Sequence, residues 1–329
     1  MITYLELLHH FQSPVYDFLK TNNVLGDNII LLGLGGSRAY GTDIESSDWD
    51  CRGVATRSAE DILTGRDWEQ SVNTATDTTI YSFDKLIKLL CSCNPNTIEI
   101  LGLKPEHYIK ITDVGQELLN NKQMFLSKKA VNSFGGYALA QLNRLVNKSG
   151  RKQEEVMGNE TRSINKAIIA LRNKNIIDKN IKFYEADDEI RVTIDSDMPL
   201  ESFIKLYQAV DNVHTDYRTS SRNNKAIEHG KLAKHQMHLI RLYFMALDIL
   251  EKGEINTYRE KEHDFLMDVR NGKYLENETT PTKEFMDIVY ELDNRMKVAS
   301  ETTDLPDSPD MNKVHKFVEK INKNIVIYS

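Results

Sequence analysis

Long apolar runs and cysteine-rich segments are both missing from this sequence of 329 residues. No apolar run approaches the roughly 20 residues that a bilayer-spanning helix requires. The three cysteines, Cys51, Cys91 and Cys93, are too few and too irregularly spaced for a disulfide framework, and one Cys-x-Cys pair argues against a zinc site. The N-terminal segment lacks the basic start and apolar block of a signal peptide. From these absences we expect a cytoplasmic protein.

A surplus of basic residues is also missing. The chain has 42 lysines and arginines against 49 acidic residues, which gives a net charge of −7. Proteins that coat duplex nucleic acid neutralise phosphates with surplus lysine and arginine, so the balance argues against that class. It leaves room for an enzyme with a local basic cleft. Apolar residues make up 40% of the chain, which excludes global disorder.

The pattern of apolar residues predicts a small sheet followed by a largely helical part. Three segments predict strands: 28–36, 49–55 and 74–83. Helical spacing or end signals predict helices at 1–23 with a break near Pro14, 84–93, 97–103, 113–150, 162–173, 226–252, 282–300 and 311–325. Residues 182–194 predict a hairpin. The expected fold class is α/β, or α+β, with a small mixed sheet. Residues 1–112 would form a catalytic domain, and residues 113–329 a mostly helical domain that closes the nucleotide and acceptor cleft.

Two carboxylates follow a glycine turn at the end of the first predicted strand. Gly35, Gly36 and Ser37 end the apolar run, and Asp48 and Asp50 follow after ten intervening residues. Residues i and i+2 of a strand point to one face, so the two carboxylates are expected side by side. Such a pair repels unless a cation lies between, and oxygen ligands suit Mg²⁺ or Mn²⁺. The turn offers backbone N–H groups and a hydroxyl to phosphate oxygens. The pattern predicts a nucleoside triphosphate site with metal.

A two-metal site needs a third carboxylate, and Asp77 is the best candidate. It enters the predicted strand that ends near Phe83, and a neighbouring strand would bring it beside Asp48 and Asp50. There it would bind one metal and accept the proton of an attacking hydroxyl. Asp84 and Glu99 are weaker alternatives, because one lies at a helix start and the other beside a helix.

The long predicted helix carries a basic stripe. Lys231, Lys234, His238 and Arg241 fall within about 80° of one another at about 100° per residue. Apolar residues occupy the opposite side: Leu232, Leu239, Ile240, Tyr243, Phe244 and Leu247. The stripe either faces a phosphate across the cleft or forms an ordinary solvated face.

Four further residues near the acids are candidates for a role in the site, and three of them have two interpretations. Arg38 follows Ser37 and is a candidate phosphate contact. Arg52 either contacts the substrate or neutralises the carboxylates. Tyr40 and Trp49 either stack on a base or belong to the core.

The motif GSRAYGTDIESSDWDCRG at residues 36–53 resembles the nucleotidyltransferase superfamily typified by DNA polymerase β. Within it, the motif is similar to a bacterial and phage family of nucleotidyltransferases, some associated with RNA repair. DTTIYSFDKLIKLL, CNPNTIEIL, FLSKKAVNSFGGYALAQLNRL, GKLAKHQMHLIRLYFMALDILEKGEI and FLMDVRNGKY extend the resemblance along the chain, with residues 151–224 the weakest part. The resemblance implies active-site roles for Gly36, Ser37, Asp48, Asp50 and Asp77.

The expected activity is metal-dependent transfer of a nucleoside monophosphate from an NTP to an acceptor hydroxyl, with release of pyrophosphate. The cofactors would be two Mg²⁺ or Mn²⁺ ions, and Arg38, Lys234, His238 and Arg241 would assist nucleotide binding. The resemblance and the basic stripe favour an RNA 3′ end, such as that of a tRNA, as acceptor. A small molecule or a protein hydroxyl is an alternative that the net acidity favours. A third alternative is a non-catalytic nucleotide-binding protein, but the three intact acids argue against it.

Overall fold

In a computed structural model, the described residues are 4–135, 138, 153–174, 176, 181–186, 189–194, 197–228, 232–276 and 280–328. The chain forms two compact units. The first comprises Met1–Ala140, Gln236–Lys273 and Lys283–Ser329, and the second comprises Gln141–His235 and Tyr274–Thr282. These units do not follow the boundary expected after residue 112, so the division into a catalytic and a helical domain stays a prediction.

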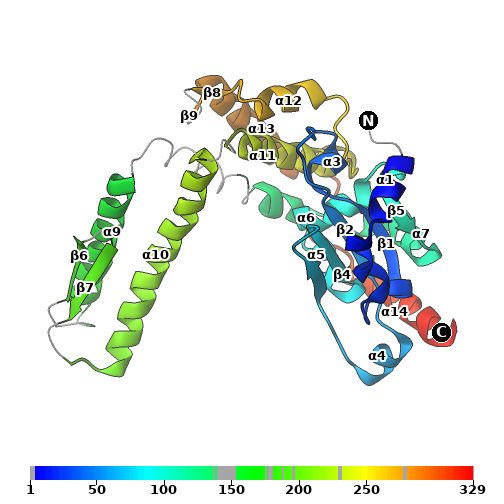
Figure 1. Cartoon of the computed structure of the whole chain (residues 1–329), viewed down its shortest axis with the longest axis horizontal. Coiled ribbons are helices and arrows are strands. Elements are labelled where there is room, and N and C mark those ends of the chain that lie inside the picture. Colours follow the sequence, from blue (N-terminus) through cyan, green and yellow to red (C-terminus); the bar gives the residue numbers. More distant parts are fainter. Residues whose placement is uncertain are drawn as a thin grey trace. The chain divides into compact units, whose positions relative to one another are not determined.

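A five-stranded mixed sheet lies at the centre of the first unit (Figure 1). Its order is β3 (Gln70–Asn73), β4 (Thr78–Ser82), β2 (Cys51–Ala55), β1 (Ile29–Leu34) and β5 (Tyr108–Ile111). Only β2 and β4 run parallel among these neighbours. Every residue of β1 is buried, as its nearly continuous apolar sequence predicts for a central strand. The α/β fold class and the three predicted strands are confirmed, whereas β3 and β5 are additional.

Short helices surround the sheet. Those before residue 140 are α1 (Tyr4–Phe11), α2 (Phe18–Thr21), α3 (Gly36–Tyr40), α4 (Ala59–Thr64), α5 (Phe83–Cys91), α6 (Pro95–Ile98) and α7 (Asp113–Asn120). 3-10 turns span Pro14–Tyr16, Gly26–Asn28, Glu99–Gly102, Pro105–His107 and Lys122–Phe125, and a π-helical turn spans Val131–Gly135. The break predicted at Pro14 and the helix after β4 are confirmed.

The sequence predicted helix over 113–150 with an interruption at Gly135 and Gly136, and this prediction is wrong in its first part. Helix α7 ends at Asn120, where the Asn121 side chain donates to the Glu117 carbonyl oxygen at 2.8 Å. Short turns follow, and residues 139–150 lie outside the described part of the chain. A capping side chain thus interrupts the apolar period.

Helices from the C-terminal half complete the first unit. They are α11 (Leu232–Leu247), which belongs to this unit from Gln236 on, its π-helical continuation Asp248–Lys252, α12 (His263–Arg270), α13 (Lys283–Thr302) and α14 (Met311–Tyr328). Helices α13 and α14 confirm the two predicted C-terminal helices, whereas α12 is not among the predicted ones. Of the predicted helix 226–252, residues 226–228 lie in α10 and residues 232–252 lie in α11 and its π-helical continuation, whereas residues 229–231 lie outside the described part of the chain.

The second unit contains α9 (Gln153–Asn173), a hairpin of β6 (Ile181–Ala186) and β7 (Glu189–Ile194), and α10 (Leu200–Glu228). Its core is built from Ile164, Ile168, Ile181 and Leu206. The hairpin confirms the prediction for 182–194. A two-residue pair, β8 (Leu275–Glu276) and β9 (Thr280–Pro281), also belongs to this unit.

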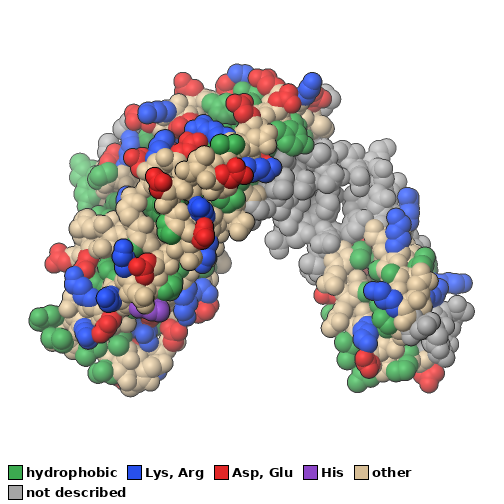
Figure 2. All heavy atoms as spheres, turned by 180° about the vertical axis from the view of Figure 1, so that it is seen from behind, with side chains coloured by type: hydrophobic (Ala, Val, Ile, Leu, Met, Phe, Trp, Pro, Cys, Tyr) green, Lys and Arg blue, Asp and Glu red, His purple; other side chains and the backbone are tan. Residues whose placement is uncertain are grey.

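Two surface properties bear on the predicted partners. No helix in the described ranges is long and apolar enough to cross a membrane. On the face in Figure 2, basic and acidic side chains are interspersed. A local arrangement, rather than the overall charge, must therefore carry any nucleotide binding.

Candidate active site

The glycine turn packs directly against one of the predicted acids. Gly36 has a left-handed φ of 57°, and a Cβ atom there would overlap the Asp50 carboxylate. The Gly35 amide donates to the Asp50 carbonyl oxygen at 2.8 Å. Glycine is therefore required at Gly36 by both backbone conformation and space. The glycine bend and Asp50 are therefore packed together and joined by a backbone hydrogen bond.

Helix α3 begins at this bend and is short. Ser37 is buried, and its carbonyl oxygen accepts a hydrogen bond from the Thr42 amide at 2.9 Å. The helix ends at Gly41, which is left-handed with φ 70°. The bend, Ser37 and the end of α3 thus belong to one tight strand–turn–helix segment.

Asp50 and Asp77 lie at the same edge of the sheet. Each immediately precedes a strand, and the parallel strands β2 and β4 start in register at Cys51 and Thr78. The Cys51 amide donates to the Asp77 carbonyl oxygen at 3.2 Å. Asp77 has φ 41°, which is uncommon for a residue with a side chain and often marks a functional position. The neighbouring strand thus brings Asp77 beside Asp50.

Asp48 and Asp50 are not on a strand, which corrects the sequence-based expectation. Strand β2 begins only at Cys51, so both acids lie in the preceding loop and the i, i+2 rule does not apply to them. Asp48 is exposed, and its carbonyl oxygen accepts from Arg38 Nε at 3.2 Å. Trp49 stacks on His10 at 4.1 Å between ring centroids. Side chains, rather than a sheet ladder, hold this loop.

Arg38 stabilises the loop that carries Asp48. Its Nη2 donates to the Ser47 carbonyl oxygen at 2.8 Å, and its Nη1 pairs with Asp43 at 3.2 Å. Its guanidinium also lies 4.1 Å from the Trp49 ring centroid. All three of its nitrogens therefore have protein partners, and its predicted phosphate contact stays a prediction.

Arg52 pairs with Asp77, as one of its two predicted roles requires. Arg52 Nη1 donates to the Asp77 carbonyl oxygen at 2.6 Å, and Nη2 lies 3.3 Å from the carboxylate. The Asp77 side chain remains 61% exposed. The two weaker candidates for the third carboxylate have other partners. Asp84 pairs with Arg57 at 2.7 Å, and Glu99 accepts a hydrogen bond from the Tyr40 hydroxyl.

The acids fit a divalent cation in chemistry, and two of them lie at one edge of the sheet. All three are hard oxygen ligands, and Asp50 and Asp77 are neighbours at one sheet edge. In the described ranges no group of three or more His, Cys, Asp or Glu side chains is gathered in a metal-binding arrangement. The carboxylates of Asp50 and Asp77 instead lie against Gly36 and Arg52. A metal would have to compete with these contacts.

The predicted basic stripe is not one exposed face. Lys231 lies outside the described residues, Lys234 is exposed, and His238 is half-buried. Arg241 is only 6% exposed, and its guanidinium lies 3.6 Å from the Tyr40 ring centroid. The solvated-face interpretation is therefore wrong for Arg241. The nucleotide-binding roles of the three described residues stay predictions.

Tyr40 of α3, half-buried Glu99 and buried Arg241 form a polar cluster. The Tyr40 hydroxyl donates to Glu99 Oε2 at 2.8 Å. Burial raises the pKa of Glu99, and the nearby Arg241 charge and the Tyr40 hydrogen bond oppose that rise. Asp50 is among the charges that act on Arg241. The sequence left two roles open for Tyr40, stacking on a nucleotide base or packing in the core, and the structure places its ring in the core.

Two arginines near the bend escaped the sequence analysis. Arg259 is 3% exposed, pairs with Asp248 at 2.6 Å, and donates its amide to the Tyr40 carbonyl oxygen at 3.1 Å. Arg270 Nη2 donates to Ser47 Oγ at 3.1 Å. Buried and less buried positions alternate along residues 255–260 in the structure, but the sequence does not reveal this, because a charged residue at a buried position does not count as apolar.

Comparison with known protein families gives a match over most of the chain. The model of the RNA repair pathway DNA polymerase beta family matches residues 9–320. No curated protein and no solved structure matches the chain significantly. Because the match spans nearly the whole sequence, the chain belongs to the RNA repair pathway DNA polymerase beta family.

Proposed function

We propose that this protein is a metal-dependent nucleotidyltransferase that moves a nucleoside monophosphate from an NTP to an acceptor hydroxyl. The observation that carries the proposal is the adjacency of Asp50 and Asp77 at the start of two parallel strands, with Asp50 packed on the Gly36 bend. Membership of a polymerase β family supports the same reaction class.

In this reaction the acceptor oxygen bonds to the α-phosphorus as the bond from that phosphorus to the bridging oxygen breaks and pyrophosphate leaves. Gly36 and Ser37 hold the β- and γ-phosphates, because the bend brings backbone N–H groups and a hydroxyl together. Asp48, Asp50 and Asp77 are the metal ligands, and Asp77 accepts the proton of the acceptor hydroxyl. Bound Mg²⁺ or Mn²⁺ supplies charge stabilisation for the attacking and leaving oxygens. Arg38 keeps the Asp48 loop against α3.

The acceptor that we propose is an RNA 3′ end, such as that of a damaged tRNA. The family's association with RNA repair supports it. A small-molecule or protein hydroxyl is the second candidate, because the net charge of −7 does not favour a large polyanion. The test must therefore separate acceptors as well as detect transfer.

The experiment supplies each α-labelled NTP with Mg²⁺ or Mn²⁺ and then tRNA, total protein or a small-molecule extract. Label in RNA supports the first acceptor, and label in protein or small molecules supports the second. Asp48→Ala and Asp50→Ala should abolish labelling with the fold intact. Asp287→Ala is the matched control, because Asp287 is an exposed acid on α13. Labelling by both active-site variants at the control level, or no label with the wild type, counts against the enzyme.

A further inference from the structure

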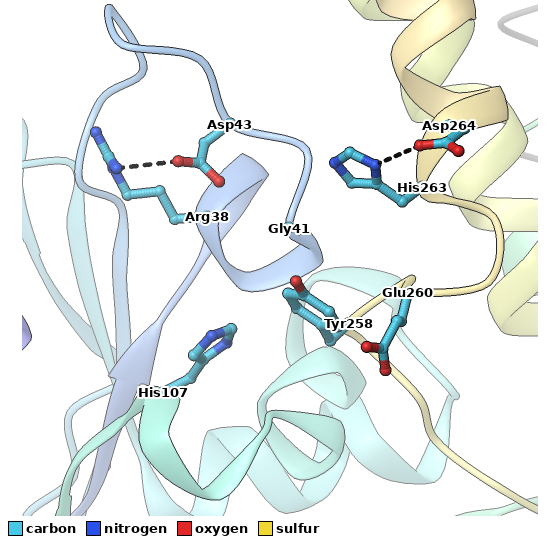
Figure 3. A pocket seen from close by; sticks show the side chains of 8 residues that line it. All are labelled: Arg38, Gly41, Asp43, His107, Tyr258, Glu260, His263 and Asp264. Atoms are coloured by element: carbon cyan, nitrogen blue, oxygen red, sulfur yellow. Dashed lines mark hydrogen bonds and ion pairs between the residues drawn. The ribbon is translucent and has the colours of Figure 1, made fainter. Parts of the chain in front are cut away.

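A separate pocket lies at the opposite end of α3 from the glycine bend. Its volume is about 410 Å³, within the range of small-molecule sites. Figure 3 shows its lining residues, which are Arg38, Gly41, Asp43, His107, Tyr258, Glu260, His263 and Asp264. No candidate residue from the sequence motifs lies in it except Arg38.

The wall formed by Tyr258 is fixed in place. A Cβ atom at Gly41 would overlap the Tyr258 ring, so the ring packs directly on the helix end. Lys104 Nζ lies 3.6 Å from the ring centroid, and His107 meets the ring edge-on at 5.6 Å. In Figure 3 the hydroxyl of Tyr258 points into the space between Gly41 and His263. The pocket therefore presents a preformed hydroxyl.

Two histidines add polar groups. His107 is 3% exposed, yet its Nδ1 has no hydrogen-bond partner in the described structure. Burial lowers the pKa of His107, which favours the neutral ring with one donor and one acceptor. His263 is oriented by a 3.0 Å hydrogen bond from its Nδ1 to Asp264, and its other nitrogen faces the pocket in Figure 3.

The charges of the pocket argue against a phosphate. Three carboxylates line it, those of Asp43, Glu260 and Asp264. Its one arginine, Arg38, already donates from all three nitrogens to Asp43 and to loop carbonyl oxygens. The part of a ligand that enters the pocket should instead lack phosphate and carry hydroxyl or amino groups that donate to carboxylates.

We propose that this pocket binds a nucleoside, with ribose hydroxyls or base amino groups donating to Asp43 and Glu260. The inference rests on the proposed function, which supplies nucleosides as part of the NTP and of the RNA end. Arg38 connects the two places, because it pairs with Asp43 in the pocket and holds the backbone of Asp48. Helix α3 has five residues, about 7 Å of rise, so a nucleotide can reach from the pocket to the bend.

The test measures binding of adenosine, guanosine, cytidine and uridine, each without phosphate, by titration calorimetry. Tyr258→Phe removes only the hydroxyl, and His263→Ala removes a half-exposed ring. Each should weaken nucleoside binding about three- to tenfold, the range of one lost hydrogen bond. The matched controls Tyr290→Phe and His315→Ala change exposed side chains on α13 and α14 and should bind as the wild type does.

Separate arms with NTP and with tRNA identify the source of the nucleoside. If the pocket variants also bind NTP more weakly, the pocket holds the incoming nucleotide. If they bind tRNA more weakly, the pocket holds the acceptor end. Absent nucleoside binding by the wild type, unchanged binding by both pocket variants, or a loss confined to free nucleosides would each overturn the proposal. If the pocket variants bind normally while Asp48→Ala lacks transfer, the pocket assignment fails and the enzyme stands. Thermal unfolding checks that every variant is folded.

Discussion

Replacement of Gly36 by alanine tests the contact between the bend and Asp50. An alanine at φ 57° carries left-handed strain, and its Cβ would overlap the Asp50 carboxylate. Gly65 is a matched control, because it is also left-handed, with φ 70°, but has open space around its Cβ position. The two substitutions therefore share the backbone strain and differ in the overlap with Asp50.

The strain costs about 1–2 kcal/mol, and the stiffer unfolded chain returns about 0.4–1 kcal/mol. Gly65→Ala should thus lower the free energy of unfolding by about 1 kcal/mol and leave transfer intact. Overlap in a packed site adds about 1–3 kcal/mol, so Gly36→Ala should lose about 2–4 kcal/mol. Because the Asp50 carboxylate must move away, transfer should also be lost.

Urea denaturation measures the stabilities, and incorporation of labelled NMP measures transfer. Equal stability losses in the two variants would mean that the overlap with Asp50 is easily relieved. Full transfer by Gly36→Ala would mean that the contact does not position the metal ligand. Either result would refute the reasoning.

Three further predictions concern charges around the site. Arg52→Gln removes the exposed ion pair with Asp77 and should tighten Mn²⁺ binding up to about fivefold. Electron paramagnetic resonance measures the Mn²⁺ affinity, and an unchanged affinity would mean that Arg52 does not compete with the metal for Asp77. Burial raises the pKa of Glu99, so its folded state holds the proton more tightly, and stability is lost as the pH rises above the ordinary value of 4.5. Glu99→Gln should flatten this part of the urea-midpoint profile, and parallel profiles would exclude the effect. Lys234→Gln should lower the salt slope of tRNA binding by about one phosphate contact, and an unchanged slope would remove this lysine from the interface.

The parts of the site that the sequence predicted correctly depend on short-range patterns. The apolar run Ile29–Leu34 is long enough to identify a buried strand, and the glycines after it mark the turn. Asp50 was assigned to the predicted strand 49–55 and Asp77 to 74–83, and the observed strands β2 and β4 that directly follow the two acids are indeed neighbours. These inferences need only the neighbours of each residue along the chain.

The errors arose where distant residues decide the local structure. Asp48 was placed on a strand, but β2 starts at Cys51 because the preceding loop is held by Arg38. Arg241 was assigned to a stripe that either faces a phosphate or is solvated, since a helical wheel shows which residues share a side and not what packs against that side. Tyr40, far away in sequence, packs on the Arg241 guanidinium, and Glu99 is among the charges that act on it.

The predicted catalytic domain of residues 1–112 does not contain everything that holds its own bend. The far end of α3 is fixed by three contacts from the C-terminal half of the chain. The Arg241 guanidinium packs on the Tyr40 ring, the Arg259 amide donates to the Tyr40 carbonyl oxygen, and Tyr258 packs on Gly41. A desolvated cation–π contact alone contributes about 2 kcal/mol, so α3 in an isolated fragment 1–112 would lose much of its support. The bend that holds phosphate in the proposed reaction is thus positioned from both its strand and its helix, and the C-terminal helices act on it through α3.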